Sequence, residues 1–469
     1  MGNSTAVSTQ QHSTSSVRDR TSSLSSQNPN GSLEQSKSGN YIQYNKPYSA
    51  TNKSFAGSPT PTKTAPSSYS SVPVNNILVY KDMVTQTTVT YNCSSSRWKN
   101  NIFVANRINL GDFIIGTFAF YMFVCTSLIF SPHLQSYIVY LNFVRYPGND
   151  LTDLRSLGLS YRTTRNILIT TEDGLILKGY HLIPPLEDIR TNPLCKHLNI
   201  TSDNYQNSNK SNECFDLILS RATRILLYCH GNGGTRALPM RVAIVQQMAQ
   251  LLGANVITFD YRGFGDSEGW PSEYGTHLDA RAAFHWIHDR LVSPRSAFIY
   301  LYGHSLGTGI SSALVAEVNR FSPRAVTGLV LDCPFTSLVE SSMTHPMAYP
   351  FRIFTIIRAL LRRNLAFKYA TIDRIHRLYC PLLLLHGKED PKIPFEHSQL
   401  LYQAALSNPS NCALNLSQSM KIHTEGANNE CHFHTALQLV PGAVHNNVYV
   451  FPEWLDSIST FIAHVEDTS

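Results

Sequence analysis

The sequence predicts an α/β domain, a mostly parallel sheet with helices on both faces, preceded by one transmembrane helix. Two observations lead to this prediction. From Tyr161 onward, short apolar runs alternate with longer amphipathic stretches, which is the pattern of strands separated by helices. Before that point, residues 113–130 (FIIGTFAFYMFVCTSLIF) contain no charged side chain and come close to the ~20 residues that cross a bilayer.

The first part of the 469-residue chain is polar. Residues 1–71 consist mainly of Ser, Thr, Asn, Gln, Gly and Pro, with almost no branched aliphatic side chains. Such a segment buries too little apolar surface to offset the entropy that ordering costs. We therefore predict a disordered tail over residues 1–109, a transmembrane helix at 110–131 and a juxtamembrane segment at 132–160.

Charges around the apolar segment predict its orientation. Arg97, Lys99 and Arg107 precede it, and the next basic residue after it is Arg145. Because basic residues remain on the cytosolic side of a membrane, the N-terminus is predicted to be cytosolic and everything after Phe130 lumenal or extracellular. A buried core helix is the alternative for a segment of this length.

Cysteines and glycosylation sequons fit a lumenal or extracellular location of the chain after Phe130, because disulfides and N-glycans form there. Two polar stretches each place sequons between two cysteines, and each is predicted to be a disulfide-closed surface loop, although sequence does not fix the connectivity. They contain Cys195, Asn199, Asn209 and Cys214 in the first stretch, and Cys412, Asn415 and Cys431 in the second. Three further cysteines next to apolar runs are predicted to be buried and unpaired: Cys229, Cys333 and Cys380.

The folded part, residues 161–469, opens with a predicted hairpin. Residues 166–182 form two alternating runs joined by Asp173-Gly174. Near-continuous apolar runs then predict strands that are buried on both faces: RILLYC, NVITFD, AFIYLY, GLVLD and PLLLLH. Helices are predicted after Gly234, at 274–291 and at 306–319, and a last amphipathic helix covers PEWLDSISTFIAHV.

Ser305 lies where the strand AFIYLY gives way to the helix that starts at Leu306, within the sequence YGHSLGT. A nucleophile elbow requires this strand-turn-helix context, and small residues at Gly303 and Gly307 let strand and helix approach each other. We therefore predict that the Ser305 hydroxyl is a nucleophile. The alternative is an ordinary glycine turn.

A reactive serine requires a base and an acid, which follow it in the order acid, histidine in this type of site. Asp390 lies in the loop after PLLLLH and is the predicted acid, with Glu389 and Asp332 as alternatives. His445 lies between the run ALQLV and the last helix, and is the predicted base.

The stretch CHGNGGTR follows the first buried strand and suits an anion site. The backbone N–H groups of Asn232 and Leu306 are the predicted oxyanion donors for a tetrahedral acyl intermediate. A phosphate-binding turn is the alternative, but no GxGxxG or GxxxxGK[ST] motif is present in the sequence. The sequence therefore predicts neither a cofactor, nor a metal ion, nor a nucleic-acid partner.

Several motifs together resemble the membrane-anchored lysophosphatidylserine and monoacylglycerol lipases of the α/β-hydrolase-domain family. They are CHGNGGTR, VITFDYRGFGDSEGWPSEYG, YLYGHSLGTG, LVLDCPFTS, PLLLLHGKEDPKIPF and LNFVR, and the resemblance runs from about Leu141 to the end of the chain. It implies an α/β-hydrolase fold with its catalytic serine, acid and histidine at Ser305, Asp390 and His445. It also implies a serine hydrolase in the endoplasmic reticulum membrane, with a lumenal catalytic domain that acts on lysophospholipids and monoacylglycerols.

A helical cap is predicted at about 334–378, because the stretch between the strands GLVLD and PLLLLH is too long for a simple crossover. Within it, a basic amphipathic segment carries Arg358, Arg362 and Arg363. Such a segment suits an anionic membrane surface or headgroup. The alternative is a domain helix with solvated arginines.

The sequence thus predicts an ester hydrolase that releases a fatty acid. A catalytically silent, membrane-tethered binding protein and an acyltransferase are the alternatives. The charges of DYRGFGDSEG are predicted to fix a loop and to take no part in chemistry. The oligomeric state is not predicted.

Overall fold

The computed structural model describes residues 77–81, 88–92, 109–200, 208–293, 297–322, 325–344, 355–414, 416 and 433–468. The chain divides into two compact units, residues 1–104 and 105–469. In the first unit, strands β1 (Ile77–Lys81) and β2 (Thr88–Asn92) pair antiparallel. Neither strand was expected in this tail, although both segments are rich in the β-branched and aromatic residues that favour strands. The rest of the predicted disordered tail lies outside the described residues.

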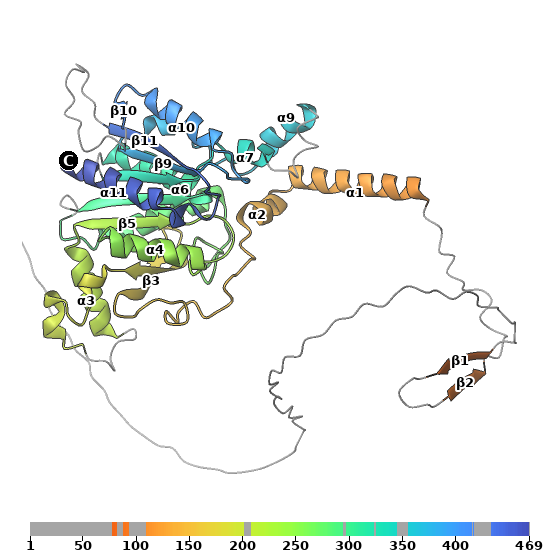
Figure 1. Ribbon diagram of the computed structural model, residues 1–469, viewed down its shortest axis with the longest axis horizontal. Helices are drawn as coiled ribbons and strands as arrows, with labels where there is room; N and C mark the ends of the chain where they lie inside the picture. The colour runs from red at the N-terminus through yellow and green to blue at the C-terminus, as the bar shows by residue number, and fades with distance from the viewer. Residues whose placement is uncertain are drawn as a thin grey trace, which may run out of the picture. The chain divides into compact units, whose positions relative to one another are not determined.

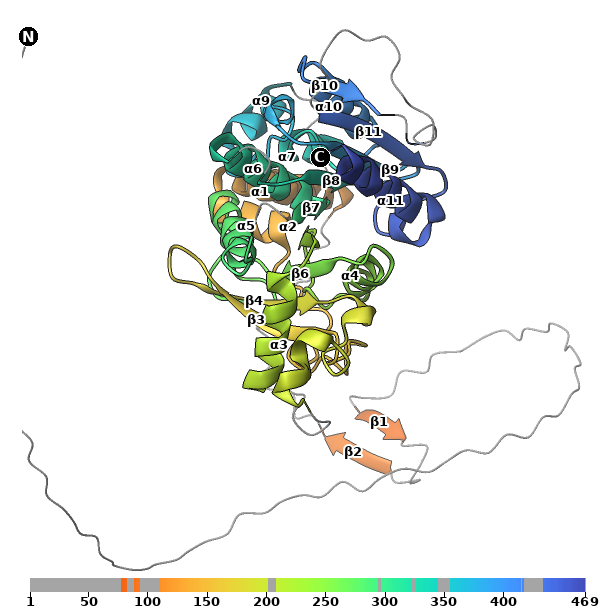
Figure 2. The same ribbon diagram turned by 90° about the vertical axis from the view of Figure 1, so that its left-hand side faces the viewer.

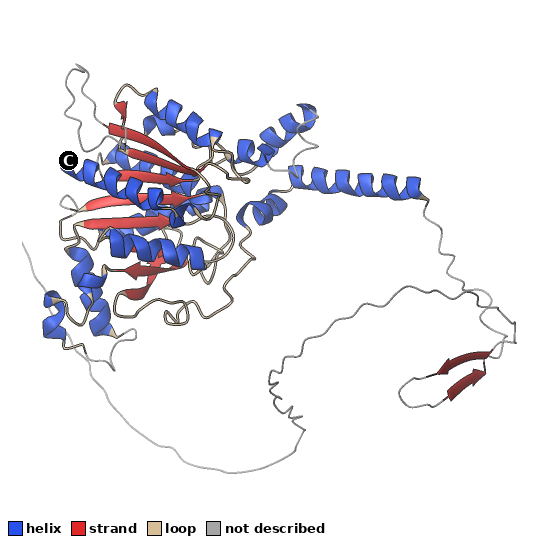
Figure 3. Ribbon diagram, in the orientation of Figure 1, coloured by secondary structure: helices blue, strands red, loops and turns tan. Residues whose placement is uncertain are grey.

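The second unit is built on a nine-stranded sheet with the order β10-β11-β9-β8-β7-β5-β6-β4-β3. Figure 3 shows the strands of this sheet in red between helices in blue. Its strands are β3 (Thr164–Thr170), β4 (Ile176–Leu182), β5 (Arg224–Cys229), β6 (Asn255–Phe259), β7 (Phe298–His304), β8 (Gly328–Asp332), β9 (Leu382–Gly387), β10 (Asn411–Ala413) and β11 (Phe433–Val440). The pairs β3–β4 and β4–β6 are antiparallel and the others are parallel. The predicted hairpin and all five predicted central strands are confirmed.

Helices cover both faces of the sheet (Figure 2). Those that flank it are α4 (Pro239–Leu251), α5 (Glu273–His288), α6 (Leu306–Phe321), α10 (Glu396–Leu406) and α11 (Pro452–Asp467). One core cluster lies under α5, α6 and α10, and a second lies under α4 and α11. Strand β5 alternates between them, with Leu227 in the first cluster and Leu226 in the second, which explains why its sequence is continuously apolar.

Two helices precede the sheet, α1 (Leu110–Phe130) and α2 (Pro132–Tyr140). In Figure 1, α1 extends from the body of the unit beyond α2, and one of its ends contacts α9. The predicted helix at 110–131 is therefore present. Within the described part of the chain, however, no helix has the length and apolarity needed to cross a membrane, so the predicted transmembrane span is not supported.

Helix α2 is integrated into the second unit. The Gln135 side chain donates to the carbonyls of Ile129 (3.1 Å) and Asn364 (3.2 Å) and accepts from the Ala366 N–H (2.8 Å). The hydroxyl of Tyr140 lies 2.9 Å from that of Tyr369. The predicted juxtamembrane segment, residues 132–160, is therefore not separate from the folded domain but packs within the same compact unit as the sheet.

The first predicted disulfide loop is confirmed, because Cys195 and Cys214 are bonded. They join η2 (Pro193–Leu198) to α3 (Asn209–Ser220), next to η1 (Pro185–Glu187), over a small apolar cluster of their own. Cys412 is also disulfide-bonded, whereas its predicted partner Cys431 and the sequon at Asn415 lie outside the described residues. The cysteines predicted to be buried and unpaired are so in the structure: Cys229, Cys333 and Cys380.

The predicted cap lies between β8 and β9. Its described elements are α7 (Leu338–Thr344), α9 (Thr355–Asn364) and η6 (Ile375–Arg377). A last short helix, η7 (Val448–Val450), follows β11 and leads into α11.

Candidate active site

Ser305 occupies a strained turn between β7 and α6. Its backbone has φ +51° and ψ −117°, a conformation that side-chain-bearing residues adopt only when the surroundings impose it. A Cβ at Gly303 would collide with the backbone of Gly307, and a Cβ at Gly307 would overlap the carbonyl of Cys229. Both glycines are therefore required for strand and helix to meet here, as expected of a nucleophile elbow.

The structure brings the three predicted catalytic residues into one hydrogen-bonded row. His445 Nε2 lies 2.9 Å from Ser305 Oγ, and His445 Nδ1 lies 2.6 Å from Asp390 Oδ2. Because a carboxylate only accepts hydrogen bonds, Nδ1 carries the proton and Nε2 is free to accept the one of Ser305. The three residues follow β7, β9 and β11, whose carboxyl ends meet at one edge of the sheet.

Asp390 is held as a carboxylate. Its Oδ1 accepts from the N–H groups of Lys392 (2.8 Å) and Ile393 (3.0 Å). Burial on its own would raise the pKa of Asp390, but hydrogen bonds from His386 and His445 outweigh it and hold this pKa well below its usual range. His386 Nε2 lies 3.4 Å from Asp390 Oδ2, so this histidine belongs to the surroundings of the site. His386 could not be recognised from the sequence as part of the site, because it lies near the end of an apolar strand.

The alternative acids lie elsewhere. Glu389 Oε2 accepts from the Gly442 N–H at 2.6 Å. Asp332 Oδ2 accepts from the Tyr302 hydroxyl at 2.6 Å, and burial raises the pKa of Asp332 to about 6. The backbone carbonyl of Asp332 accepts from the Ser305 N–H at 2.9 Å, so Asp332 supports the elbow through its main chain.

Two further side chains lie against the backbone of His445. His304 Nε2 is 3.1 Å and Cys333 Sγ 3.7 Å from the His445 carbonyl oxygen. Burial lowers the pKa of His304 to about 3 and raises that of the Cys333 thiol well above its ordinary value.

Cys333, Asp390 and His445 offer potential metal ligands within 4.8 Å of one another. Since Asp390 and His445 bond each other and the thiol is held protonated, the cluster fits a proton-transfer site and does not fit a metal site.

The predicted oxyanion donors lie on either side of the nucleophile. Leu306 is the first residue of α6, so its N–H has no acceptor inside the helix. Asn232 follows Gly231, where an added Cβ would lie 3.2 Å from Ser305 Cβ. Within the described residues, neither the Asn232 nor the Leu306 backbone N–H donates a hydrogen bond to a protein acceptor.

The cap arginines are not joined to this row by any interaction in the described part of the chain. Arg362 pairs with Glu340 at 2.8 Å, with both side chains about half exposed. Arg363 is exposed, and the side chain of Arg358 lies outside the description. Two of the charges predicted to fix a loop do so: Arg262 Nε donates to Asp279 Oδ1 at 2.9 Å, and the buried Arg236 Nη1 donates to Asp260 Oδ2 at 2.6 Å.

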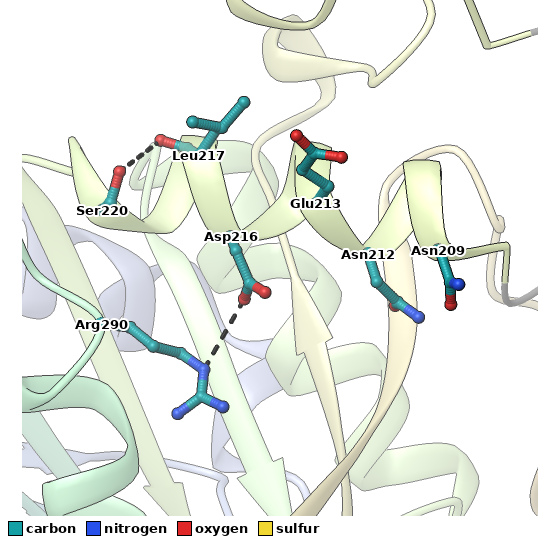
Figure 4. A pocket seen from close by; sticks show the side chains of 7 residues that line it. All are labelled: Asn209, Asn212, Glu213, Asp216, Leu217, Ser220 and Arg290. Atoms are coloured by element: carbon teal, nitrogen blue, oxygen red, sulfur yellow. Dashed lines mark hydrogen bonds and ion pairs between the residues drawn. The ribbon is translucent and has the colours of Figure 1, made fainter. Parts of the chain in front are cut away.

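A surface hollow of about 480 Å³ lies along α3, away from these residues (Figure 4). Asp216 and Arg290 face each other there, 3.6 Å apart, and Asn209, a predicted glycosylation site, lines one end. None of the predicted catalytic residues lines the hollow, so it is not the candidate active site.

Residues 224–354 match the family of the alpha/beta hydrolase fold. The chain is 31% identical to lysophosphatidylserine lipase ABHD12 of Danio rerio over 287 residues, which are 60% of this chain and 68% of that protein. It is 33% identical to lysophosphatidylserine lipase ABHD12 of Xenopus tropicalis over 298 residues, 62% of this chain and 71% of that protein. Among solved structures, the alpha-beta hydrolase from Vibrio vulnificus is 18% identical and covers 70% of this chain and 92% of its own, with a TM-score of 0.48.

Proposed function

The chain belongs to the family of the lysophosphatidylserine lipases within the α/β hydrolases, and on that premise we propose that it hydrolyses the acyl ester of lysophosphatidylserine and of monoacylglycerols. The observation that supports the reaction is the continuous row from Ser305 through His445 to Asp390, with distances of 2.9 and 2.6 Å. Such a row activates a serine hydroxyl at neutral pH.

In the first half of the reaction, Ser305 Oγ attacks the ester carbonyl carbon while His445 Nε2 takes the hydroxyl proton. Asp390 stabilises the imidazolium that forms. The negative charge on the former carbonyl oxygen is stabilised by the N–H groups of Asn232 and Leu306, each worth about 3 kcal/mol in the transition state. His445 then protonates the glycerol oxygen, which leaves as the headgroup-bearing alcohol, and the acyl group stays on Ser305.

In the second half, water takes the place of the alcohol. His445 accepts a proton from water as the water oxygen attacks the acyl carbonyl, and the same two N–H groups receive the second oxyanion. Collapse of the intermediate returns a proton to Ser305 Oγ and releases the fatty acid. The buried Asp390 remains a carboxylate throughout, consistent with the direction of its pKa shift.

Membrane association is part of the proposal. Large apolar side chains of α1 are exposed along its length, among them Phe113, Ile115, Phe118, Phe120 and Phe123, and contact with lipid would remove this surface from water. We place the enzyme at the endoplasmic reticulum membrane with the catalytic unit on the lumenal side. The Cys195–Cys214 disulfide supports an oxidising compartment, and the basic residues before α1 support a cytosolic N-terminus.

The reaction is tested by incubating the full chain in membranes with lysophosphatidylserine or a monoacylglycerol and measuring released fatty acid. Ser305→Ala is the matched control, because it removes one oxygen atom and leaves the elbow glycines in place. We expect release by the wild type only, and labelling of the wild type only by a fluorophosphonate. A folded wild type that neither labels nor releases fatty acid would contradict the proposal.

The orientation is tested separately by glycosidase treatment, which should increase gel mobility. Changing Asn199, Asn209 and Asn415 to Gln should abolish that shift. A shift that survives these changes, and disappears when the sequons of the N-terminal tail are removed, would reverse the orientation.

A further inference from the structure

Arg241, on α4, is a buried cation whose hydrogen bonds go to backbone carbonyls. It is only 2% exposed. Its Nη2 donates to the carbonyls of Gly231 (2.8 Å), Asn232 (3.0 Å) and Gly233 (2.6 Å), and its Nη1 to that of Thr235 (2.9 Å). We call residues 231–235 the oxyanion loop, since they contain the proposed donor Asn232. One guanidinium therefore holds most carbonyls of this loop.

These hydrogen bonds also determine where the N–H groups point. In a trans peptide the carbonyl and the following N–H point in opposite directions. The carbonyls of Asn232 and Gly233 face the guanidinium, so the N–H groups of Gly233 and Gly234 face away from it, and they donate to the carbonyls of Tyr140 (2.8 Å) and Val144 (2.9 Å). Positive φ angles of +61° and +65° at the two glycines allow this arrangement.

In the peptide between Gly231 and Asn232 the carbonyl and the N–H also point in opposite directions, but this N–H has no protein acceptor in the described part of the chain. Its carbonyl also faces the guanidinium of Arg241, so the Asn232 N–H points away from Arg241. Unlike its two neighbours in the loop, this N–H meets no protein acceptor within the described residues. Its peptide adjoins the nucleophile, since a Cβ on Gly231 would lie 3.2 Å from Ser305 Cβ.

We propose that Arg241 is a positioning residue for the oxyanion hole: by holding three consecutive carbonyls of the oxyanion loop, it aims the Asn232 N–H at the reacting acyl oxygen. The inference rests on the proposed hydrolase function and deepens it. Without the guanidinium, the Asn232 and Gly233 carbonyls lose this donor, and the Gly231 carbonyl keeps only His230 Nδ1, at 2.7 Å. The Gly231–Asn232 peptide is then held by one hydrogen bond where it had two, and its N–H is less firmly aimed. Loss of one oxyanion donor lowers kcat by about 10²–10³-fold, and a peptide that is misaligned for part of the time should lose roughly 10- to 100-fold.

The test compares Arg241→Lys and Arg241→Met in the full chain, with a small soluble ester as substrate. Lysine keeps the charge but cannot hold the carbonyls in the fork geometry of a guanidinium. We expect kcat to fall in both variants, more in Arg241→Met, with KM nearly unchanged, because an oxyanion donor acts in the transition state. The inhibition constant of a trifluoromethyl ketone, which forms a tetrahedral adduct on the serine, should rise by the same factor as kcat/KM falls.

Arg165→Met is the matched control. Arg165 is another buried arginine, bonded to Asp216 at 2.5 Å and to the Asn212 carbonyl at 2.9 Å, next to α3. This variant should lower the melting temperature and leave kcat close to that of the wild type.

The outcomes separate this inference from the proposed function. A wild type no faster than Ser305→Ala would refute the hydrolase function itself. With an active wild type, four results would overturn the role of Arg241: an unchanged kcat in folded variants, a rise in KM alone, a similar loss of kcat in Arg165→Met, or failure of both Arg241 variants to fold. The last would make Arg241 a folding residue.

Discussion

The replacement Asp390→Asn is expected to disable catalysis through the tautomer of His445. In the wild type, Oδ1 of Asp390 accepts two backbone N–H groups and Oδ2 accepts His445 Nδ1–H. An asparagine has one oxygen and one NH₂ group. The oxygen will face the two backbone donors, because the opposite orientation would set its NH₂ group against both of them. The NH₂ group then faces Nδ1.

With a donor facing Nδ1, the neutral imidazole must carry its proton on Nε2. An Nε2 that carries a proton cannot accept the one of Ser305, so the nucleophile is not activated. Loss of the correct tautomer in a serine triad lowers kcat by about 10⁴-fold, which corresponds to ~5.4 kcal/mol in the activation barrier. We expect a loss of this size, measured as kcat on a soluble ester.

Glu389→Gln is the internal control for this prediction. Glu389 is adjacent in sequence, but its carboxylate bonds the exposed Gly442 N–H and does not contact His445. Its replacement should leave kcat within about twofold of the wild type. If Asp390→Asn retained kcat within tenfold of the wild type, or if Glu389→Gln caused the larger loss, the assignment of the acid would be refuted.

Three further predictions concern the elbow, the buried acid and the cap. Gly307→Ala places a methyl group on the carbonyl of β5, so we expect loss of activity and an unfolding free energy lower by over ~3 kcal/mol in a denaturant titration; wild-type activity would contradict the elbow geometry. The folded pKa of Asp332 is raised to about 6, so its ionisation destabilises the protein as pH rises from 4 to 6, and Asp332→Asn should gain up to about 3 kcal/mol over the wild type between pH 4 and pH 7; a pH-independent difference would exclude this. Replacing the cap arginines Arg358, Arg362 and Arg363 with Gln should reduce hydrolysis of lysophosphatidylserine more than that of a monoacylglycerol or a soluble ester. Equal losses on all three substrates would point to a structural role of these arginines.

The central strands and the hydrogen-bonded row of Ser305, His445 and Asp390 could be predicted because local sequence determines them. A strand that is buried on both faces needs apolar residues throughout, and β5 to β9 show this directly. The position of Ser305 could be predicted because the close contact of strand and helix at a nucleophile elbow requires glycines at positions 303 and 307. Asp390 and His445 could be predicted because the carboxyl ends of parallel strands meet at one edge.

The residues around that row could not be predicted from the sequence, because distant segments determine their roles. His386 ends an apolar strand, and only the fold of the loop after it brings Asp390 within 3.4 Å. Arg241 lies in a predicted helical stretch, where the sequence does not distinguish it from a surface arginine, and it is buried because the oxyanion loop folds back over α4. Strand β10 has three residues, too few for a period to be recognised.

The contacts of α2 and the residues after it restrict where the chain can be shortened. Tyr140, Val144 and Tyr146 provide the carbonyls that accept the N–H groups of Gly233, Gly234 and Thr235. A fragment that begins at residue 161, or at residue 224 where the family match starts, would contain the whole catalytic row but would leave these three donors without acceptors. The smallest fragment that preserves the oxyanion loop therefore begins no later than Pro132, the first residue of α2. Helix α2, which ends more than twenty residues before the first strand of the sheet, is thus a required part of the folded enzyme.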